Sequence, residues 1–95
     1  MVARLPDFEW DEAKRQRTLA DRFLDFEDAA LFFDGRPAFH QPTPRHGEER
    51  WKTTAQISGL MVTLVWVRRL DAIRVVSMRR SHVSEERAYR AAFGV

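Results

Sequence analysis

The segment "LMVTLVWVRRLDAIRVVSMRR" (residues 60–80) decides the fold, because it contains two long strand-like runs joined by a turn. In the first run, residues 60, 62, 64 and 66 are apolar on one face, and residues 61, 65 and 67 make the other face apolar too. A strand that is apolar on both faces is covered on both sides. We therefore predict that Leu60–Arg69 is a central strand, paired with Ala72–Arg79 through a turn at Leu70 and Asp71.

Two further strand-like segments precede this pair, at Ala38–Gln41 and Arg50–Ile57. Ser58 and Gly59 form a tight turn between Arg50–Ile57 and the central strand. Short connections of this kind join antiparallel neighbours. We therefore expect an antiparallel sheet of about four strands.

Helical patterns flank the sheet on both sides in the sequence. Asp11 and Asp25 are suitable N-caps for two N-terminal helices. The first has a thin apolar stripe of Ala13, Ala20 and Leu24, and the second has Phe26, Ala29, Ala30 and Phe33 at helical spacing before Gly35 and Pro37 end it. Ser81 or Ser84 caps a C-terminal helix, with Tyr89, Ala92 and Phe93 facing inward. The predicted fold class is α+β, with two helices, about four antiparallel strands and a final helix.

The composition limits the classes of protein to consider. A chain of 95 residues that is 44% hydrophobic can form one core, so we expect a single domain over residues 1–95. The absence of cysteine excludes disulfides, cysteine nucleophiles and thiolate metal sites. No apolar run is long enough for a signal peptide or a bilayer span. We therefore expect a cytoplasmic protein that does not bind a membrane.

The formal net charge of +2 hides an uneven distribution. Residues 1–44 contain six basic and nine acidic side chains, a net of −3, whereas residues 45–95 contain ten basic and five acidic ones, a net of +5. Fourteen of the sixteen basic residues are arginine, whose guanidinium group suits phosphate binding and stacking on bases. A genome that favours arginine codons explains that ratio equally well. The position of the charge is the better indication, and it places a surface for an anionic partner in the second half of the chain.

Arginines follow one another along the last predicted strand. Strict alternation puts Arg74, Val76, Met78 and Arg80 on one face, and Ile73, Val75, Ser77 and Arg79 on the other. An arginine among aliphatic residues in a sheet needs an anion or a carboxylate partner. Arg74 therefore binds either a phosphate or a carboxylate such as Glu49. Arg79 and Arg80, at the end of the strand, lie either in a site or on a solvated edge.

The segment "RHGEERW" (residues 45–51) concentrates charged groups just before and within a predicted strand. Alternation puts Glu49 and Trp51 on one face, and Glu48, Arg50 and Lys52 on the other. Arg45 and His46 belong to the preceding loop, where they are freer to reach a ligand. The imidazole of His46 is either a proton carrier in catalysis or part of a polar surface loop.

Neither a metal nor another cofactor is expected. The three histidines, at positions 40, 46 and 82, lack the compact spacing of metal ligands. The chain also contains no glycine-rich phosphate loop, nucleophile elbow or dinucleotide fingerprint. An enzyme acting on nucleic acid here would work by positioning and charge alone.

Several segments in order resemble one known family across nearly the whole chain. They are "FEWDEAK" (residues 8–14), "FEDAALFFD" (residues 26–34), "RHGEERW" (residues 45–51) and "IRVVSMRR" (residues 73–80), followed by Glu85 and Tyr89. Together they are similar to the BrnT-type toxins, the ribonuclease toxins of type II toxin-antitoxin pairs. The resemblance implies a RelE-like fold and a toxin that cleaves mRNA and inhibits translation. It also implies a cognate BrnA-type antitoxin with a ribbon-helix-helix end, assembled as a heterotetramer that contacts promoter DNA only through the antitoxin.

Metal-free RNA cleavage of the kind typical of RelE-like nucleases needs cations, a base and an acid. We predict that Arg74 and Arg79 stabilise charge on phosphorus, that His46 or Glu49 is the base, and that Tyr89 or His82 is an acid or a stacking surface. The predicted RNA-binding residues are Arg45, Arg50, Lys52, Arg69, Arg80 and His82. The chain has "VRRL" at residues 67–70 where the family usually has "TERG". That departure keeps an alternative open, a non-catalytic basic module that docks RNA or an acidic protein partner.

Overall fold

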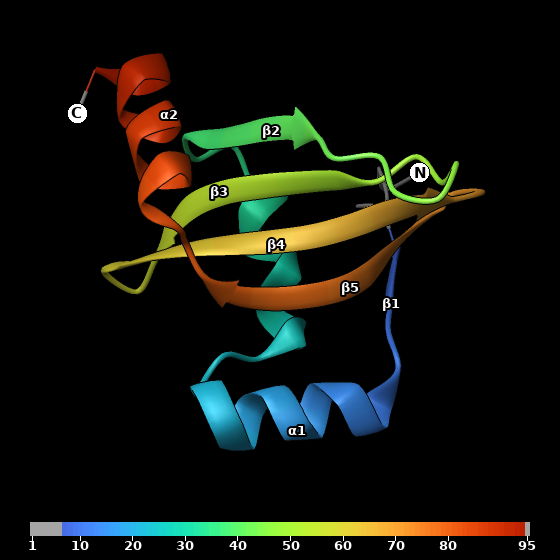
Figure 1. Ribbon diagram of the computed structural model, residues 1–95. Coiled ribbons are helices and arrows are strands. Elements are labelled where there is room, and N and C mark those ends of the chain that lie inside the picture. Colours follow the sequence, from blue (N-terminus) through green and yellow to red (C-terminus); the bar gives the residue numbers. More distant parts are fainter. Residues whose placement is uncertain (1–6, 95) are drawn as a thin grey trace, which may run out of the picture.

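The computed structural model describes residues 7–94, which form a twisted sheet with helical elements on both faces (Figure 1). In chain order the elements are β1 (Asp7–Glu9), α1 (Glu12–Arg22), the 3-10 helix η1 (Phe26–Phe33), β2 (Ala38–Pro42), β3 (Trp51–Ile57), β4 (Leu60–Arg69), β5 (Ala72–Arg80) and α2 (Val83–Phe93). The α+β class is confirmed. The strand boundaries predicted from the alternating pattern agree with the observed ones to within one residue at each end.

The sheet has five strands in the order β1-β5-β4-β3-β2 and is mixed, so the prediction of about four antiparallel strands is incomplete. Strands β2 to β5 are antiparallel neighbours, as predicted. The fifth strand, β1, pairs in parallel with β5 at the sheet edge. With only three residues it is too short for alternation to reveal. Strand β4 lies at the centre, as its two apolar faces indicated.

A β-bulge in β5 overturns the predicted facing of its arginines. Val65 pairs with Ser77 and Trp66 with Val75, so Val76 is an extra residue without a partner on β4. The extra residue shifts the alternation by one position. Ile73, Val75 and Met78 are therefore buried, while Arg74, Ser77 and Arg79 share the opposite face of the sheet. The prediction that Arg74 and Arg79 lie on different faces was wrong for this reason.

The second helix also departs from its prediction, because it is a 3-10 helix with three residues per turn. Phe26, Ala29 and Phe32, spaced by three, are its buried residues. The α-helical spacing predicts that Phe33 is in the core. Phe33 is instead only partly buried and packs against the core. Asp25 is the N-cap as predicted, accepting a hydrogen bond from the Glu27 N–H at 3.0 Å.

The helical elements lie on opposite faces of the sheet. Helix α2 stands over one face against β2 and β3, and η1 crosses the other, with α1 beyond it (Figure 1). Asp11 caps α1 as predicted, but α1 has no buried residue, and Leu24 lies past its end. In α2 the buried residues are Glu85 and Tyr89, whereas the predicted inward-facing Ala92 and Phe93 are exposed. The N-cap of α2 is His82, between the two predicted serines.

Within residues 7–94, no helix is both long and apolar enough to cross a membrane.

Candidate functional site

A basic cleft of about 340 Å³ opens where the N-terminus of α2 meets the sheet. We define the basic cleft by its lining residues, which are Thr43, Arg45, Arg50, Lys52, Val65, Val76, Ser77, Arg79, His82 and Glu85. Four of these side chains are cationic at neutral pH and one is a carboxylate. The cleft therefore has an excess of positive charge and suits an anionic ligand.

Glu85 is the carboxylate around which the cleft is built. Its side chain is only 2% exposed and accepts five hydrogen bonds. Arg79 donates two of these as a fork, Nη1 to Oε1 at 2.7 Å and Nη2 to Oε2 at 2.8 Å. Lys52 Nζ donates to Oε2 at 3.1 Å, and the backbone N–H of His82 donates to Oε1 at 2.8 Å. Glu85 thus fixes the positions of two cations from two strands.

The fifth hydrogen bond comes from a buried ladder of hydroxyl groups. Thr63 Oγ1 donates to Glu85 Oε1 at 3.0 Å, which uses its single proton. The hydroxyls of Thr54, at 3.2 Å, and Ser81, at 2.8 Å, must then donate to Thr63. The ladder links hydroxyl groups of β3, of β4 and of the residue after β5 to the carboxylate, and each hydroxyl has a hydrogen-bond partner.

These contacts determine the pKa values of Glu85 and Arg79. Burial alone raises the pKa of the Glu85 carboxyl, but its five hydrogen bonds outweigh burial and hold the pKa well below its usual range. The same contact raises the pKa of Arg79. Glu85 is therefore ionised at any physiological pH, with both oxygens occupied by donors, and is not available as a general base.

The cleft brings together five of the residues predicted for RNA contact and catalysis. Arg45, Arg50, Lys52, Arg79 and His82 all line it. Arg50 Nε also donates to Glu48 Oε1 at 2.7 Å, and that hydrogen bond lowers the pKa of Glu48. Thr43 and Arg50 are joined by a backbone hydrogen bond of 2.8 Å, which fixes the start of β3 beside the end of β2.

Arg74 and Arg69 lie on the same face of the sheet as Arg79 but outside the cleft. Arg74 is 35% exposed, and its Nη1 lies 3.7 Å from Glu9 Oε1 on β1. The partner proposed from the sequence, Glu49, is on the opposite face. Arg69 lines a separate depression at the end of β4, beside Glu9 and Asp71.

The two predicted bases also lie outside the basic cleft. His46 and Gly47 are the central residues of a tight turn closed by hydrogen bonds between Arg45 and Glu48, and both have positive φ angles, 52° and 75°. His46 is exposed at the tip of this turn. Glu49 lies on the other side of β3, in a pocket lined by aromatic rings. "RHGEERW" is thus divided between a turn and two faces, as alternation predicted.

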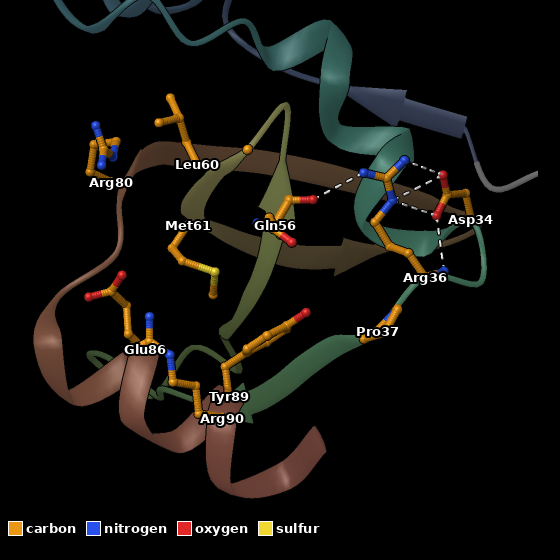
Figure 2. Close-up of a pocket in the computed structure, with 11 residues that line it drawn as sticks. Asp34, Arg36, Pro37, Gln56, Leu60, Met61, Arg80, Glu86, Tyr89 and Arg90 are labelled. Carbon is orange, nitrogen blue, oxygen red and sulfur yellow. Dashed lines mark hydrogen bonds and ion pairs between the residues drawn. The ribbon is translucent and has the colours of Figure 1, made fainter. Parts of the chain in front are cut away.

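Tyr89 and Arg80 lie in another cavity, of about 830 Å³, between α2 and the β3–β4 hairpin. Figure 2 shows Tyr89 on α2 opposite the Arg36 side chain, with Arg80 at the far end of the cavity. Tyr89 is 7% exposed and its ring lies 5.0 Å from that of Phe93. Arg36 is hydrogen-bonded to Asp34 and to the Gln56 carbonyl. Tyr89 is therefore one helical turn away from the basic cleft.

Glu85 is the functional residue that sequence reasoning missed. From the sequence, Glu85 is identified only as part of the family resemblance, and an acidic residue early in a helix usually stabilises the helix N-terminus. Its hydrogen bond to the N–H of His82, three residues earlier, is a capping interaction visible in the sequence as a carboxylate at that spacing. That the same carboxylate also binds Arg79 follows only from the packing of α2 on the sheet.

Within residues 7–94, no group of three or more histidine, aspartate and glutamate side chains is gathered as metal ligands.

One family of known proteins matches the chain over most of its length. No match to the chain was found among curated proteins. A family model described as "Ribonuclease toxin, BrnT, of type II toxin-antitoxin system" matches residues 10–85. The matched region includes every residue that lines the basic cleft. Because the match spans most of the sequence, the chain belongs to the BrnT family of ribonuclease toxins of type II toxin-antitoxin systems.

Proposed function

We propose that the basic cleft is the site at which this toxin cleaves mRNA without a metal ion, and that translation is inhibited as a result. One observation supports this more than any other: Arg79 and Lys52 are held side by side by the buried carboxylate of Glu85. Fixed cations aimed at developing charge are a large source of catalysis, because they need no reorganisation during the reaction. Family membership implies an RNA target for the protein, and the excess positive charge of the cleft makes it our candidate for the surface that binds this target.

In the proposed reaction, the 2′-oxygen of one nucleotide forms a bond to the adjacent phosphorus as the bond from phosphorus to the 5′-oxygen breaks. The 2′-hydroxyl loses its proton to a base, and the departing 5′-oxygen takes up a proton from an acid. The products are a 2′,3′-cyclic phosphate and a 5′-hydroxyl. The extra negative charge on the phosphoryl oxygens is stabilised by the guanidinium of Arg79 and the ammonium of Lys52.

We assign roles to the remaining cleft residues from their positions. Arg45 and Arg50 lie on the loop side of the cleft, where they bind neighbouring phosphates. His82 is the imidazole that lines the cleft, and its side chain is 67% exposed. We propose that His82 transfers a proton in the reaction. Arg74 extends the positive face toward β1 rather than touching the reacting phosphate.

Membership of a type II family implies an antitoxin partner. We further propose that this partner is a BrnA-type protein with a ribbon-helix-helix end, and that the complex is a heterotetramer. Co-expression of the toxin with such a protein from the neighbouring reading frame, followed by light scattering, tests both statements. A 1:1 heterodimer would contradict the stoichiometry, and separate elution would contradict the pairing.

The function is tested by incubating the purified toxin with RNA in the presence and absence of EDTA. Cleavage that survives EDTA and is lost in an Arg79→Ala variant is expected. Salt-sensitive binding without cleavage would instead establish a non-catalytic binding module. Cleavage that requires an added divalent metal would contradict the proposed mechanism.

A further inference from the structure

An aromatic pocket lies on the η1 face of the sheet, behind the basic cleft. We define the aromatic pocket by its lining residues, which are Phe33, His40, Glu49, Trp51, Trp66 and Arg68, around a volume of about 430 Å³. It is placed where β3 begins and β4 ends. Glu49 and Trp51 alternate along the chain with Arg50 and Lys52, so the two sites occupy opposite faces of the same end of the sheet.

The rings of the pocket form two flat surfaces at a right angle. Trp51 and Trp66 are stacked, with centroids 6.0 Å apart and an interplanar angle of 17°. Phe33 and His40 are stacked at 5.6 Å and 14°. Trp66 stands at 83° to Phe33 and at 89° to His40. Trp66 is buried whereas Trp51 is only partly buried, so Trp51 supplies the more accessible of the two indole surfaces.

Hydrogen bonds fix these rings before any ligand arrives. The indole N–H of Trp66 donates to Thr53 Oγ1 at 2.8 Å, and the same oxygen lies 2.7 Å from His40 Nδ1. Thr53 is fully buried and its Oγ1 accepts from Trp66, so its single hydroxyl proton is donated to His40 Nδ1. Burial also lowers the pKa of His40, which favours the neutral ring. A rigid pocket loses little entropy on binding, which favours affinity for a planar ligand.

Two charged groups border the aromatic surfaces. The guanidinium of Arg68 lies 6.0 Å from the ring centroid of Trp66, within the range of a cation–π contact. Glu49 is exposed and lies on the opposite face from the cations of the basic cleft, so it is free to accept hydrogen bonds from a ligand. The pocket therefore combines a stacking surface with a carboxylate acceptor and a guanidinium donor.

We propose that the aromatic pocket binds an unpaired nucleobase of the RNA substrate and that Glu49 makes it selective for guanine. Single-stranded RNA is recognised mainly by stacking on aromatic side chains and by hydrogen bonds to base edges. Guanine presents two adjacent N–H donors, N1–H and N2–H, which match the two oxygens of a carboxylate. Adenine, cytosine and uracil each lack such a pair on their Watson–Crick edge. The RNA target rests on the proposed function, whereas the base preference rests on the pocket alone.

The proposal gives Glu49 a role different from the catalytic base predicted from the sequence. A strand of RNA that passes around the end of the sheet exposes a phosphate to the basic cleft on one face and a base to the aromatic pocket on the other. Binding of guanine on the η1 face would then select which phosphate lies in the cleft. The pocket is a specificity site and does not contact the reacting atoms.

Nucleosides test the pocket without involving the basic cleft, because they have no phosphate. Tryptophan fluorescence of the full chain is titrated with guanosine, adenosine, cytidine and uridine. Guanosine is expected to bind at least about fivefold more tightly than the others, the discrimination of one good bidentate contact. Glu49→Gln should reduce this preference to less than twofold. Glu48→Gln, at the neighbouring carboxylate that pairs with Arg50, is the matched control and should retain it.

Trp51 provides a second variant pair that separates loss of stacking from loss of folding. Trp51→Ala should weaken guanosine binding about tenfold, the contribution of one stacked base, whereas Trp51→Phe keeps a ring and should retain most of it. Equal binding of all four nucleosides, or binding unaffected by Glu49→Gln, would overturn the proposal, as would no binding at all. Guanosine binding by a protein that cleaves no RNA would contradict the proposed function and leave the pocket intact.

Discussion

The two faces at one end of the sheet differ in what holds their side chains in place. On the α2 face, two of the four cations of the basic cleft, Lys52 and Arg79, are fixed by hydrogen bonds to one buried carboxylate, Glu85. On the η1 face, the rings of the aromatic pocket are fixed by stacking and by hydrogen bonds to one buried hydroxyl, Thr53. Both faces take residues from the same short segment, "EERWK" (residues 48–52).

This difference shows how one charged segment supplies side chains to two different environments. Because successive residues of a strand point to opposite faces, Arg50 and Lys52 reach the cleft while Glu49 and Trp51 reach the aromatic pocket. Charge dominates one site and aromatic surface the other. The backbone of RNA suits the first and its bases suit the second.

Arg79→Ala should produce the largest effect on the basic cleft. Removal of the guanidinium takes away the proposed stabilisation of the phosphoryl charge, so we expect cleavage to fall about 100-fold or more. Cleavage rates are measured on a defined RNA, with circular dichroism to confirm folding. Arg79→Lys keeps the positive charge but loses the two parallel hydrogen bonds of the guanidinium. Its cleavage rate should therefore lie between those of the wild type and Arg79→Ala. Arg87→Ala, at an exposed site on α2, should have little effect, and a rate for Arg79→Ala equal to that of Arg87→Ala would refute the assignment.

Glu85→Gln should be the next largest change, and it acts on stability. The neutral amide no longer compensates the cations of Arg79 and Lys52, so we expect the free energy of unfolding to fall by about 3 kcal/mol. Urea unfolding at neutral pH measures this loss. Glu86→Gln, at the adjacent carboxylate of the same helix, is the matched control and should change stability by less than about 0.5 kcal/mol. Equal losses in the two variants would show that the buried network contributes little.

The stability difference between the wild type and Glu85→Gln should also depend on pH. The pKa of Glu85 is lower in the folded chain than its ordinary value of 4.5, so its contribution to stability is present above that pH and is lost as the pH falls below it. The stability difference between wild type and Glu85→Gln should therefore narrow on going from pH 7 to pH 3. Other carboxyls with lowered pKa values, such as Asp25, are common to both proteins and cancel in the difference. If this stability difference instead grew as the pH fell, the pKa of Glu85 could not be lowered in the folded chain.

A smaller effect is expected for Arg45→Ala, at the loop side of the cleft. Loss of one phosphate contact should weaken binding of all RNA sequences alike and reduce the slope of log affinity against log salt by about one. Fluorescence anisotropy with RNAs of different sequence provides the measurement. If affinity fell only for particular RNA sequences, Arg45 would contact bases. Base recognition would then not be confined to the η1 face.

His46→Asn should have the smallest effect. His46 has a φ of 52° at the tip of a tight turn, where asparagine followed by glycine is the favoured pair. We expect an unchanged cleavage rate and a gain in stability of about 0.5 kcal/mol. A large loss of cleavage would place His46 in the catalytic machinery and favour the role first predicted from the sequence.

The sequence alone predicted the antiparallel part of the sheet, because alternation and tight turns are local. It also predicted all four of the cationic residues that line the cleft. It failed at Val76, where a single bulged residue reverses the facing of Arg79, and at η1, where a 3-10 period replaces the α-helical one. Neither feature has a local signal in the residue pattern. The contact between Glu85 and Arg79 depends on how α2 packs against the sheet, which alternation and periodicity do not specify.

The most direct test of the account is to identify the ends of the RNA products made in EDTA by the wild-type toxin and by Arg79→Ala. We expect 2′,3′-cyclic phosphate and 5′-hydroxyl ends from the wild type, and about 100-fold less of both from the variant. Products with 5′-phosphate ends, or cleavage that stops in EDTA and returns with magnesium, would contradict the account.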